Sequence, residues 1–428
     1  MTDRPAAWLA LAALTFSGVH SVSAAEDTSA LPLPEMVAAK TSAPPTIDGT
    51  LSPGEWDRAA ACTGFTVAFQ GNLSEVQSAA WITYDDRFIY VAMKNHRGEK
   101  TTLLRKRARK PDDGDIVFDP SNEIWLTPPS SPRATYQTLF NSYPGVFDAK
   151  KIPSVGYTAM SWTGRWEIAA SETTEYWITE AKAPITSFGV EAIKNGDTWQ
   201  ALFATDMGDR YGFRAWAPGG AFEEINRHGY VHFRDRGPVF QLLDIESVFT
   251  GKADLAMAVG APAESSANVV VTVRLGGGIL PADDDKVITR ELAVDAGELQ
   301  QFAVSADLTQ MDLALTTVTI TKKPRETKDV RSGYCEVTAE TRKGEVLYHQ
   351  VFPFVICEEF VRRAPREIQR SPYETPIGVQ AFHAPLNRKL LIKADRFYLP
   401  RREEAVRGLA RLVDPKTGRV VAERPLAP

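Results

Sequence analysis

The stretch QSAAWITYDDRFIYVAMKN, residues 77–95, contains two runs in which apolar and polar residues alternate, with Asp85 and Asp86 between them. A period of two places alternate side chains on opposite faces of a β-strand, so one face of each run can join a core. An acidic pair between two such runs is typical of a hairpin turn. We therefore predict two antiparallel strands that meet at Asp85 and Asp86.

Similar short runs, rich in β-branched and aromatic residues, continue on both sides of this hairpin. They amount to about nine strands over roughly 190 residues, with turn residues between them and no long amphipathic helix, a pattern that predicts a jelly-roll-like β-sandwich. The runs are FTVAFQ (65–70), NEIWLTP (122–128), ATYQTLFNSYPGVFDAK (134–150), YWITEAKAP (176–184), and TWQALFATD, YGFRAWAP and GYVHF, which end near Phe233.

A second series of strand signals starts near Pro238 and runs from GKADLAMAVGAP to EVLYHQVFPFVI. About seven strands in roughly 110 residues are typical of an immunoglobulin-like sandwich. The predicted fold class is therefore all-β, with a jelly-roll-like N-terminal β-sandwich followed by an immunoglobulin-like β-sandwich.

The chain has 428 residues, enough for two or three domains. Residues 1–25 combine Arg4, a short apolar stretch and small residues near Ala24, which is typical of a signal peptide and predicts a secreted or periplasmic protein. No later stretch is long and apolar enough to cross a membrane. We expect a linker at 26–38, the first sandwich at 39–235, the second at 238–360, and an incomplete β-rich tail at 365–428 that resembles the opening half of a further sandwich.

The net charge of −5 gives no reason to expect a nucleic-acid partner. The three cysteines are Cys62, Cys335 and Cys357, and no CxxC pair supports a zinc or redox site. A bridge between Cys335 and Cys357 is not favoured, because equal pairing about a turn near Gly344 does not place them opposite each other.

The segment PTIDGTLSPGEWDRAA (45–60) resembles the start of carbohydrate-binding module family 9 domains. The segments AWITYDDRFIYVAMKN, SNEIWLTP, YQTLFNSYPGVFDAK, WITEAKAPITSFG and RAWAPGGAFEEINRHGYVHF resemble later parts of the family, in the same order, across residues 39–235. The resemblance implies a β-sandwich that binds sugar, and it implies that Trp56 packs beneath the N-terminal strand to close the mouth of the sandwich.

The family holds a terminal sugar between two tryptophans, with polar side chains at the rim. In this chain the tryptophan positions fall at Val117 or Phe118 and at Phe222, and an arginine of the family is Leu139. The alternative is that these positions only maintain the scaffold, since most phenylalanines lie in cores. The carbohydrate-binding residues that the resemblance implies are Glu123, Asn141, Arg210, Phe222, Phe118 and Asn95.

Three further patterns have two interpretations each. The acidic loop with Asp112, Asp113 and Asp115 would suit calcium, which family members often carry, or is a solvated loop. The basic run at 100–110 would suit an anionic glycan, or is also solvated. Trp162 and Trp166 form either an exposed platform or a buried corner.

These patterns predict an exported, non-catalytic carbohydrate-binding protein or accessory module of a polysaccharide-degrading system, whose partners are an oligo- or polysaccharide and an associated glycoside hydrolase. One alternative is a haem-binding domain of the related cytochrome-b sandwich type, with Met93 and His96 as the nearest ligands. Another is the N-terminal part of a glycoside hydrolase, although no catalytic motif occurs in the chain. We expect no cofactor other than calcium.

Overall fold

The computed structural model describes most of the chain up to residue 357 and four strands beyond it. The predicted signal peptide, Phe118, Arg210, Asp112, Asp113, Asp115 and the basic run lie outside the described residues. The described residues are 31–68, 71–97, 116, 119–130, 133–143, 145–152, 157–207, 212–217, 221–277, 285–322, 325–357, 378–384, 389–395, 408–413 and 420–426.

The first half of the chain consists of short strands, as the alternation predicts. They are β1 (Glu35–Ala39), β2 (Ala60–Cys62), β3 (Thr66–Val67), β4 (Ser78–Tyr84), β5 (Phe88–His96), β6 (Ser121–Thr127), β7 (Thr135–Asn141), β8 (Val146–Ile152), β9 (Tyr157–Ala159), β10 (Glu167–Glu172), β11 (Tyr176–Pro184), β12 (Thr198–Asp206), β13 (Phe213–Ala215) and β14 (Gly229–Arg234). Two 3₁₀ turns, η4 (Ile185–Phe188) and η5 (Ile225–Arg227), interrupt them.

The second half is also built from strands. They are β15 (Val239–Glu246), β16 (Lys252–Gly260), β17 (Ala267–Gly276), β18 (Lys286–Val294), β19 (Leu299–Asp307), β20 (Ala314–Lys322), β21 (Arg325–Thr341) and β22 (Val346–Ile356), with the 3₁₀ turn η6 (Val248–Thr250) after β15. No helix in the described residues is long and apolar enough to span a bilayer. The all-β prediction is confirmed, because the described elements are strands and short 3₁₀ turns.

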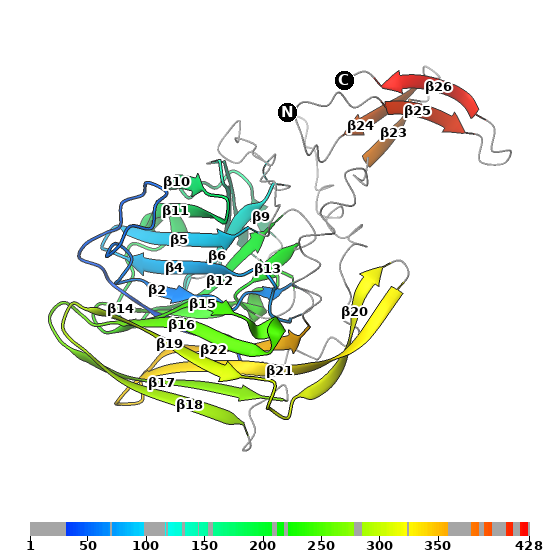
Figure 1. The fold of residues 1–428 in the computed structure, drawn as a ribbon. Helices are drawn as coiled ribbons and strands as arrows, with labels where there is room; N and C mark the ends of the chain where they lie inside the picture. Colours follow the sequence, from blue (N-terminus) through cyan, green and yellow to red (C-terminus); the bar gives the residue numbers. More distant parts are fainter. Residues whose placement is uncertain are drawn as a thin grey trace. The chain divides into compact units, whose positions relative to one another are not determined.

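Two sheets form a sandwich, and both run through the two halves (Figure 1). Sheet A has the order β18-β17-β21-β22-β1-β14-β12-β6-β7-β8-β9, and sheet B has the order β10-β11-β5-β4-β2-β15-β16-β19. Two strand pairs join the halves: β1 pairs with β22 in sheet A, antiparallel, and β2 pairs with β15 in sheet B, parallel. The described residues from 31 to 357 accordingly belong to one compact unit.

This continuity corrects the expected domain boundaries. Residues 35–38, which we assigned to a linker, belong to the buried strand β1, whose Met36 and Ala38 lie in the core. The expected boundary at 235–238 is crossed by both sheets and by one hydrophobic cluster that contains residues of both halves. Gln350 of β22 also donates hydrogen bonds to the carbonyl oxygens of Gly64 and Trp216 at 3.1 and 3.2 Å.

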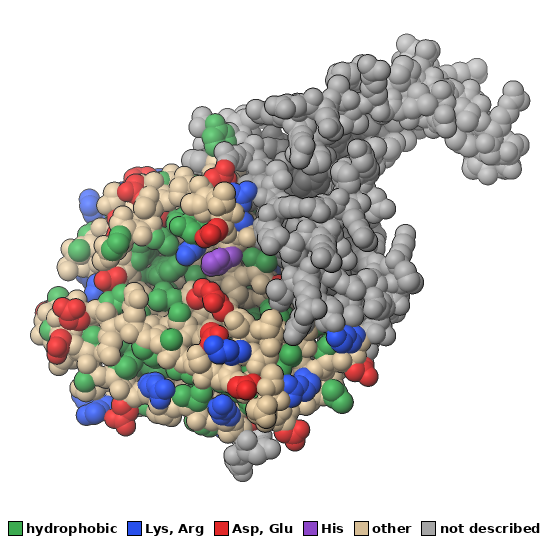
Figure 2. Space-filling model, in the orientation of Figure 1, with side chains coloured by type: hydrophobic (Ala, Val, Ile, Leu, Met, Phe, Trp, Pro, Cys, Tyr) green, Lys and Arg blue, Asp and Glu red, His purple; other side chains and the backbone are tan. Residues whose placement is uncertain are grey.

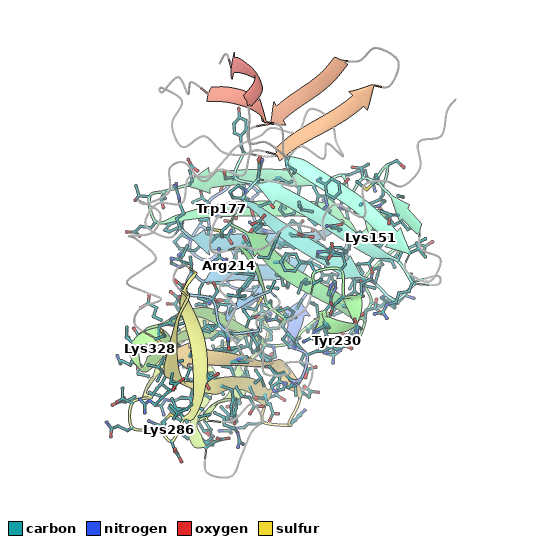
Figure 3. The ribbon with its side chains drawn as sticks, turned by 90° about the vertical axis from the view of Figure 1, so that its right-hand side faces the viewer. Lys151, Trp177, Arg214, Tyr230, Lys286 and Lys328 are labelled. Carbon is teal, nitrogen blue, oxygen red and sulfur yellow. The ribbon has the colours of Figure 1, made fainter. Side chains whose placement is uncertain are left out.

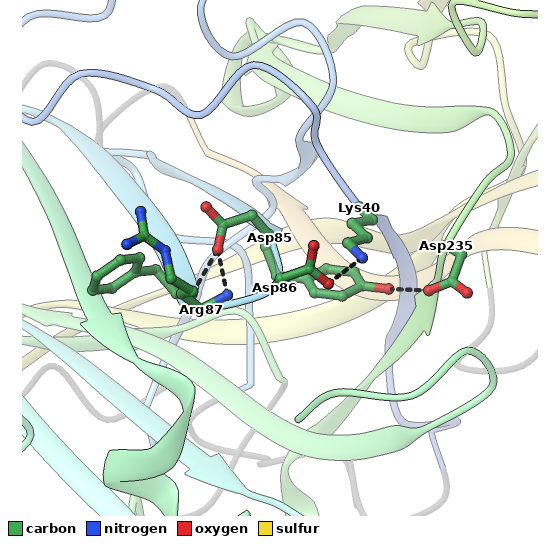
Figure 4. A network of polar contacts seen from close by, with 7 residues as sticks. Lys40, Asp85, Asp86, Arg87 and Asp235 are labelled. Carbon is green, nitrogen blue, oxygen red and sulfur yellow. Dashed lines mark hydrogen bonds and ion pairs between the residues drawn. The ribbon is translucent and has the colours of Figure 1, made fainter. Parts of the chain in front are cut away.

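The hairpin of β4 and β5 turns at Asp85 and Asp86, as predicted. One carboxylate oxygen of Asp85 accepts hydrogen bonds from the backbone N–H groups of Arg87 and Phe88, both at 2.7 Å. Asp86 forms an ion pair with Lys40, which follows β1 (Figure 4). The acidic pair therefore closes the turn and ties it to the neighbouring strand, which explains why the turn is acidic.

The segment around Trp56 covers the outer face of sheet B. Trp56 packs with Trp81 and Tyr90 in a cluster separate from the main core, and its Nε1 donates to Glu180 at 2.8 Å. The same Glu180 carboxylate accepts the backbone N–H of Gly49 at 2.7 Å. Trp56 is buried, but it lies on the outer face of sheet B and does not close the mouth of the sandwich as the resemblance implied.

Trp162 and Trp166 form a buried corner, which decides between the two interpretations of this segment. The Trp162 ring lies 4.8 Å from the Tyr136 ring, and the Trp166 ring lies 5.4 Å from the Phe140 ring. Both side chains are half-buried and pack against the main core. A Cβ on Gly164 would come within 2.3 Å of Trp166 Nε1, so this close approach requires glycine.

The tail forms a second unit, residues 366–428, described here by its strands alone. It contains two hairpins, β23 (Gly378–Ala384) with β24 (Lys389–Asp395) and β25 (Gly408–Val413) with β26 (Val420–Leu426). The three cysteines of the chain are buried and form no disulfide, which fits the expectation that a bridge between Cys335 and Cys357 is not favoured.

Candidate ligand-binding face of sheet A

Strand β6 separates its side chains onto two faces. Ile124 and Leu126 lie in the main core between the sheets, whereas Trp125 packs in a separate cluster. Because successive side chains of a strand point to opposite faces, Glu123, Trp125 and Thr127 share the face of sheet A that is turned away from sheet B. We call this face the outer face of sheet A.

Four side chains on the outer face form a polar cluster around Trp125, which we call the Glu123 cluster: Glu123, Trp125, Gln137 and Lys151. Oε1 of Glu123 accepts hydrogen bonds from Nε1 of Trp125 at 2.7 Å and from Nε2 of Gln137 at 2.6 Å. Nζ of Lys151 lies 4.3 Å from the centroid of the Trp125 ring, within the range of a cation–π contact. Lys151 is labelled in Figure 3.

Burial changes the protonation of this cluster. Desolvation raises the pKa of Glu123 to about 7, although its hydrogen bonds from Gln137 and Trp125 act in the opposite direction. Desolvation also lowers the pKa of Lys151, and Glu223 and Glu123 oppose that shift. Glu123 is 7% exposed. It therefore holds Gln137 and Trp125 in place, while the partly exposed Gln137 and Lys151 have polar groups to offer to a ligand.

Phe222 and His228 cover one side of Trp125. The His228 ring meets the Trp125 ring edge-on at 5.7 Å, and its Nε2 donates to the carbonyl oxygen of Phe222 at 2.8 Å. Burial lowers the pKa of His228 to about 4, so this imidazole is neutral near pH 7. Phe222 itself packs edge-on against Phe213 at 5.5 Å and is buried. In this arrangement Phe222 is a packing residue, and its ring presents no open face for stacking.

The structure places the two predicted asparagines inside networks of their own. Asn141 donates to Asp119 at 3.1 Å, and its Oδ1 accepts the backbone N–H groups of Tyr143 and Gly145. Both asparagines are fully buried. Asn141 therefore shapes the turn after β7, and we correct its predicted role as a sugar contact.

Asn95 lies between the sheets and not on the outer face. Its Oδ1 accepts a hydrogen bond from Ser78 at 2.7 Å, and its Nδ2 donates to Asn122 at 2.9 Å. Asn122 in turn donates to Thr179 of β11 at 2.7 Å. This polar chain links sheet B to sheet A through the core, so we also correct the predicted ligand contact of Asn95.

The same outer face contains a groove that the sequence analysis missed. It has a volume of about 220 Å³ and lies next to the Glu123 cluster, since Thr127 is on β6 and Arg133 precedes β7. Tyr230, which is labelled in Figure 3 on the same sheet as Lys151, belongs to its wall. The groove is lined by Thr127, Pro128, Pro129, Ser130, Arg133, Thr198, Gln200 and Tyr230.

Long-range pairing creates this groove. In the registers of β12 with β6 and with β14, Gln200 lies beside Thr127 on one side and beside Tyr230 on the other. Alternation within TWQALFATD indicates that Gln200 shares a face with Leu202, but it does not indicate which strands flank β12. One sequence signal could have pointed to this region. The Pro-Pro-Ser-Ser segment that follows β6 ends the strand and begins a loop beside the groove.

The surface over sheet B carries scattered charges. Figure 2 views the molecule with β4, β5, β15 and β16 in front, and charged side chains of both signs are interspersed there.

Met93 lies in the core on β5, whereas His96 is three residues further along the strand and faces the other side. These two side chains therefore do not converge on one iron, which leaves the haem alternative without its nearest ligand pair.

The described residues contain no group of three or more His, Cys, Asp or Glu side chains that could hold a metal ion. Asp112, Asp113 and Asp115 are not among the described residues, so a calcium site there stays a prediction.

Comparisons with known proteins give distant structural neighbours. No family model and no curated protein sequence matches the chain. A candidate carbohydrate-binding protein from Bacteroides uniformis is 15% identical, and the match covers 47% of this chain and 100% of that one with a TM-score of 0.39. A carbohydrate-binding module of family 9 from Caldicellulosiruptor kristjanssonii, solved with cellotriose, is 13% identical over 47% of this chain and 95% of its own, with a TM-score of 0.33.

The same module solved with glucose is 12% identical, and the match covers 47% of this chain and 97% of that one with a TM-score of 0.32. At these identities and TM-scores, and over less than half of the chain, the likeness carries no argument about this protein. What this chain binds has to follow from its own outer face.

Proposed function

We propose that this chain is an exported, non-catalytic carbohydrate-binding protein that holds a glycan on the outer face of sheet A. The observation that carries the proposal is the Glu123 cluster. Burying the Glu123 carboxylate costs free energy, and the hydrogen bonds that offset this cost hold Trp125 and Gln137 in place on the outer face. Here the carboxylate fixes the amide of Gln137 on the same face of the sheet as the ammonium of Lys151.

An amide and an ammonium on one face of a sheet suit a polyol. Sugar hydroxyl groups both donate and accept hydrogen bonds, and they are selected by a small number of convergent polar groups in a concave, partly apolar surface. Gln137 offers a carbonyl acceptor and Lys151 offers donors, while the Trp125 ring lies under Lys151 and packs in one cluster with Leu202. Glu123 acts through Gln137 as a positioning residue.

The second half would act as an accessory sandwich. Its strand order supports an immunoglobulin-like arrangement, in which β15, β16 and β19 oppose β18, β17, β21 and β22. A rigid second module of this kind would present the glycan-binding face next to an associated glycoside hydrolase, and such modules raise the local concentration of an enzyme on its polymer.

Titration calorimetry of the full chain against neutral and acidic oligosaccharides tests the proposal. We expect saturable binding that Lys151→Met weakens about tenfold, the scale of one charge-assisted hydrogen bond. The matched control is Lys150→Met, because Lys150 is the next residue on β8 and contacts the Tyr136 ring on the other side of the strand. Equal affinity for both variants, or no binding to any oligosaccharide, would contradict the proposal; release of new reducing ends would contradict its non-catalytic part.

A further inference from the structure

The groove beside the Glu123 cluster contains a buried polar atom with no partner. Gln200 is 7% exposed, and its Oε1 finds no hydrogen-bond partner in the described part of the chain. Buried polar side-chain atoms are nearly always paired, because an unpaired one loses its hydration without compensation. A ligand hydroxyl in the groove would supply the missing donor, so the Gln200 amide indicates a binding site.

Tyr230 supplies an apolar surface at the same place. It pairs with Gln200 across β14 and β12, and its ring lies at 23° to the ring of His232 with the centroids 6.4 Å apart. His232 is in turn fixed by hydrogen bonds to Thr198 and Glu35, both at 2.9 Å. A ring held in this way loses little freedom when a pyranose ring stacks on it.

The volume and charge of the groove select the kind of sugar. About 220 Å³ is less than the roughly 300 Å³ at which pockets for drug-sized ligands begin, so the groove suits a single sugar ring. Arg133 is the only charged residue among its lining residues, all of which are described, and it forms no ion pair with an acid in the described part of the chain. A guanidinium binds a carboxylate through two parallel hydrogen bonds.

We propose that this groove is a subsite for one uronic acid residue of the glycan, with the ring on Tyr230, a hydroxyl on Gln200 and the carboxylate on Arg133. The inference rests on the proposed function, because it extends the same outer face from the Glu123 cluster to the groove. It assigns the glycan to the class of acidic polysaccharides, which contain uronates.

Calorimetry with the full chain tests the subsite, with trimers of galacturonic, glucuronic and mannuronic acid and with the corresponding neutral trimers as probes. We expect at least one uronate trimer to bind, and we expect Arg133→Ala to weaken it by 10-fold or more while changing binding of the neutral trimers less than twofold. Arg290→Ala is the matched control, since Arg290 lies on the edge strand β18 and donates a hydrogen bond to the carbonyl oxygen of its neighbour Thr289 at 3.3 Å.

Two further variants separate the subsite from the fold. Tyr230→Ala and Gln200→Leu should each weaken the uronate trimer several-fold, and Gln200→Leu should not lower the melting temperature, because it removes an unpaired buried oxygen. A protein that binds neutral trimers, with no response to Arg133→Ala, would overturn the uronate assignment and leave the proposed function standing. Binding of sugars that ignores Tyr230→Ala and Gln200→Leu would overturn the subsite, and binding of no sugar at all would overturn both proposals.

Discussion

Glu123→Gln should make the stability of this protein less dependent on pH in one defined window. The pKa of Glu123 rises from 4.5 to about 7 on folding because burial disfavours its charge. A raised pKa in the folded state means that the contribution of Glu123 is most favourable below pH 4.5 and is lost as the pH rises through 7. A shift of this size corresponds to about 3 kcal/mol, at 1.36 kcal/mol per pH unit.

The glutamine variant stays neutral at every pH, and its Oε1 can still accept hydrogen bonds from Trp125 and Gln137. We therefore expect similar stabilities at pH 4.5 and a variant that is more stable by up to about 3 kcal/mol at pH 8. Urea unfolding followed by tryptophan fluorescence, at several pH values between these limits, measures the difference. Glu291→Gln is the control, since the Glu291 side chain is 68% exposed. A difference that does not change with pH, or a less stable variant at pH 8, would refute the reasoning.

Three other substitutions test single contacts. The pKa of His228 falls from 6.5 to about 4 on folding, so its stabilising contribution is lost as the pH drops from 6.5 through 4. At pH 4 we therefore expect His228→Gln to be more stable than the wild type by up to about 3 kcal/mol, measured by urea unfolding. Gly49→Ala should lower the melting temperature more than Gly54→Ala: both have positive φ, +87° and +86°, but only at Gly49 does a Cβ meet backbone, the Ala170 carbonyl carbon at 2.9 Å. Trp56→Ala should cost about 3–5 kcal/mol of unfolding free energy in urea, and a cost below 1 kcal/mol would show that the Trp56 cluster is dispensable.

The sequence predicted the strands because the information for them is local. Alternation in residues 176–184 matches β11 residue for residue, and the acidic turn of the β4–β5 hairpin lies where expected. What local patterns do not contain is the pairing of distant strands. The pairs of β1 with β22 and of β2 with β15 join the halves. The short strand Glu35–Ala39, with four of its five residues buried, has no signature that separates it from a linker.

The same limit applies to the site. The resemblance alone pointed to Glu123, and the structure shows that its neighbours Gln137 and Lys151 come from two other strands. Asn95 and Asn141 have a side chain that could contact a sugar, but both are buried in hydrogen-bond networks. An asparagine on a strand can join such a network as readily as it can bind a ligand. Whether a polar side chain is free depends on its partners, and a single sequence does not specify these.

The outer face of sheet A can change without loss of the fold, because core side chains and outer-face side chains alternate along each strand. On β6, Ile124 and Leu126 bury apolar surface in the core, while Glu123 and Thr127 lie on the outer face. On β12, Trp199, Ala201 and Phe203 fill the core, and Gln200 between them keeps an unpaired oxygen on the other face. A leucine at Gln200 would remove that oxygen at no cost to packing between the sheets. Retention of a polar group that the fold does not need is the expected mark of a surface adapted to a ligand, and a Gln200→Leu variant that is more stable and binds less well would demonstrate it.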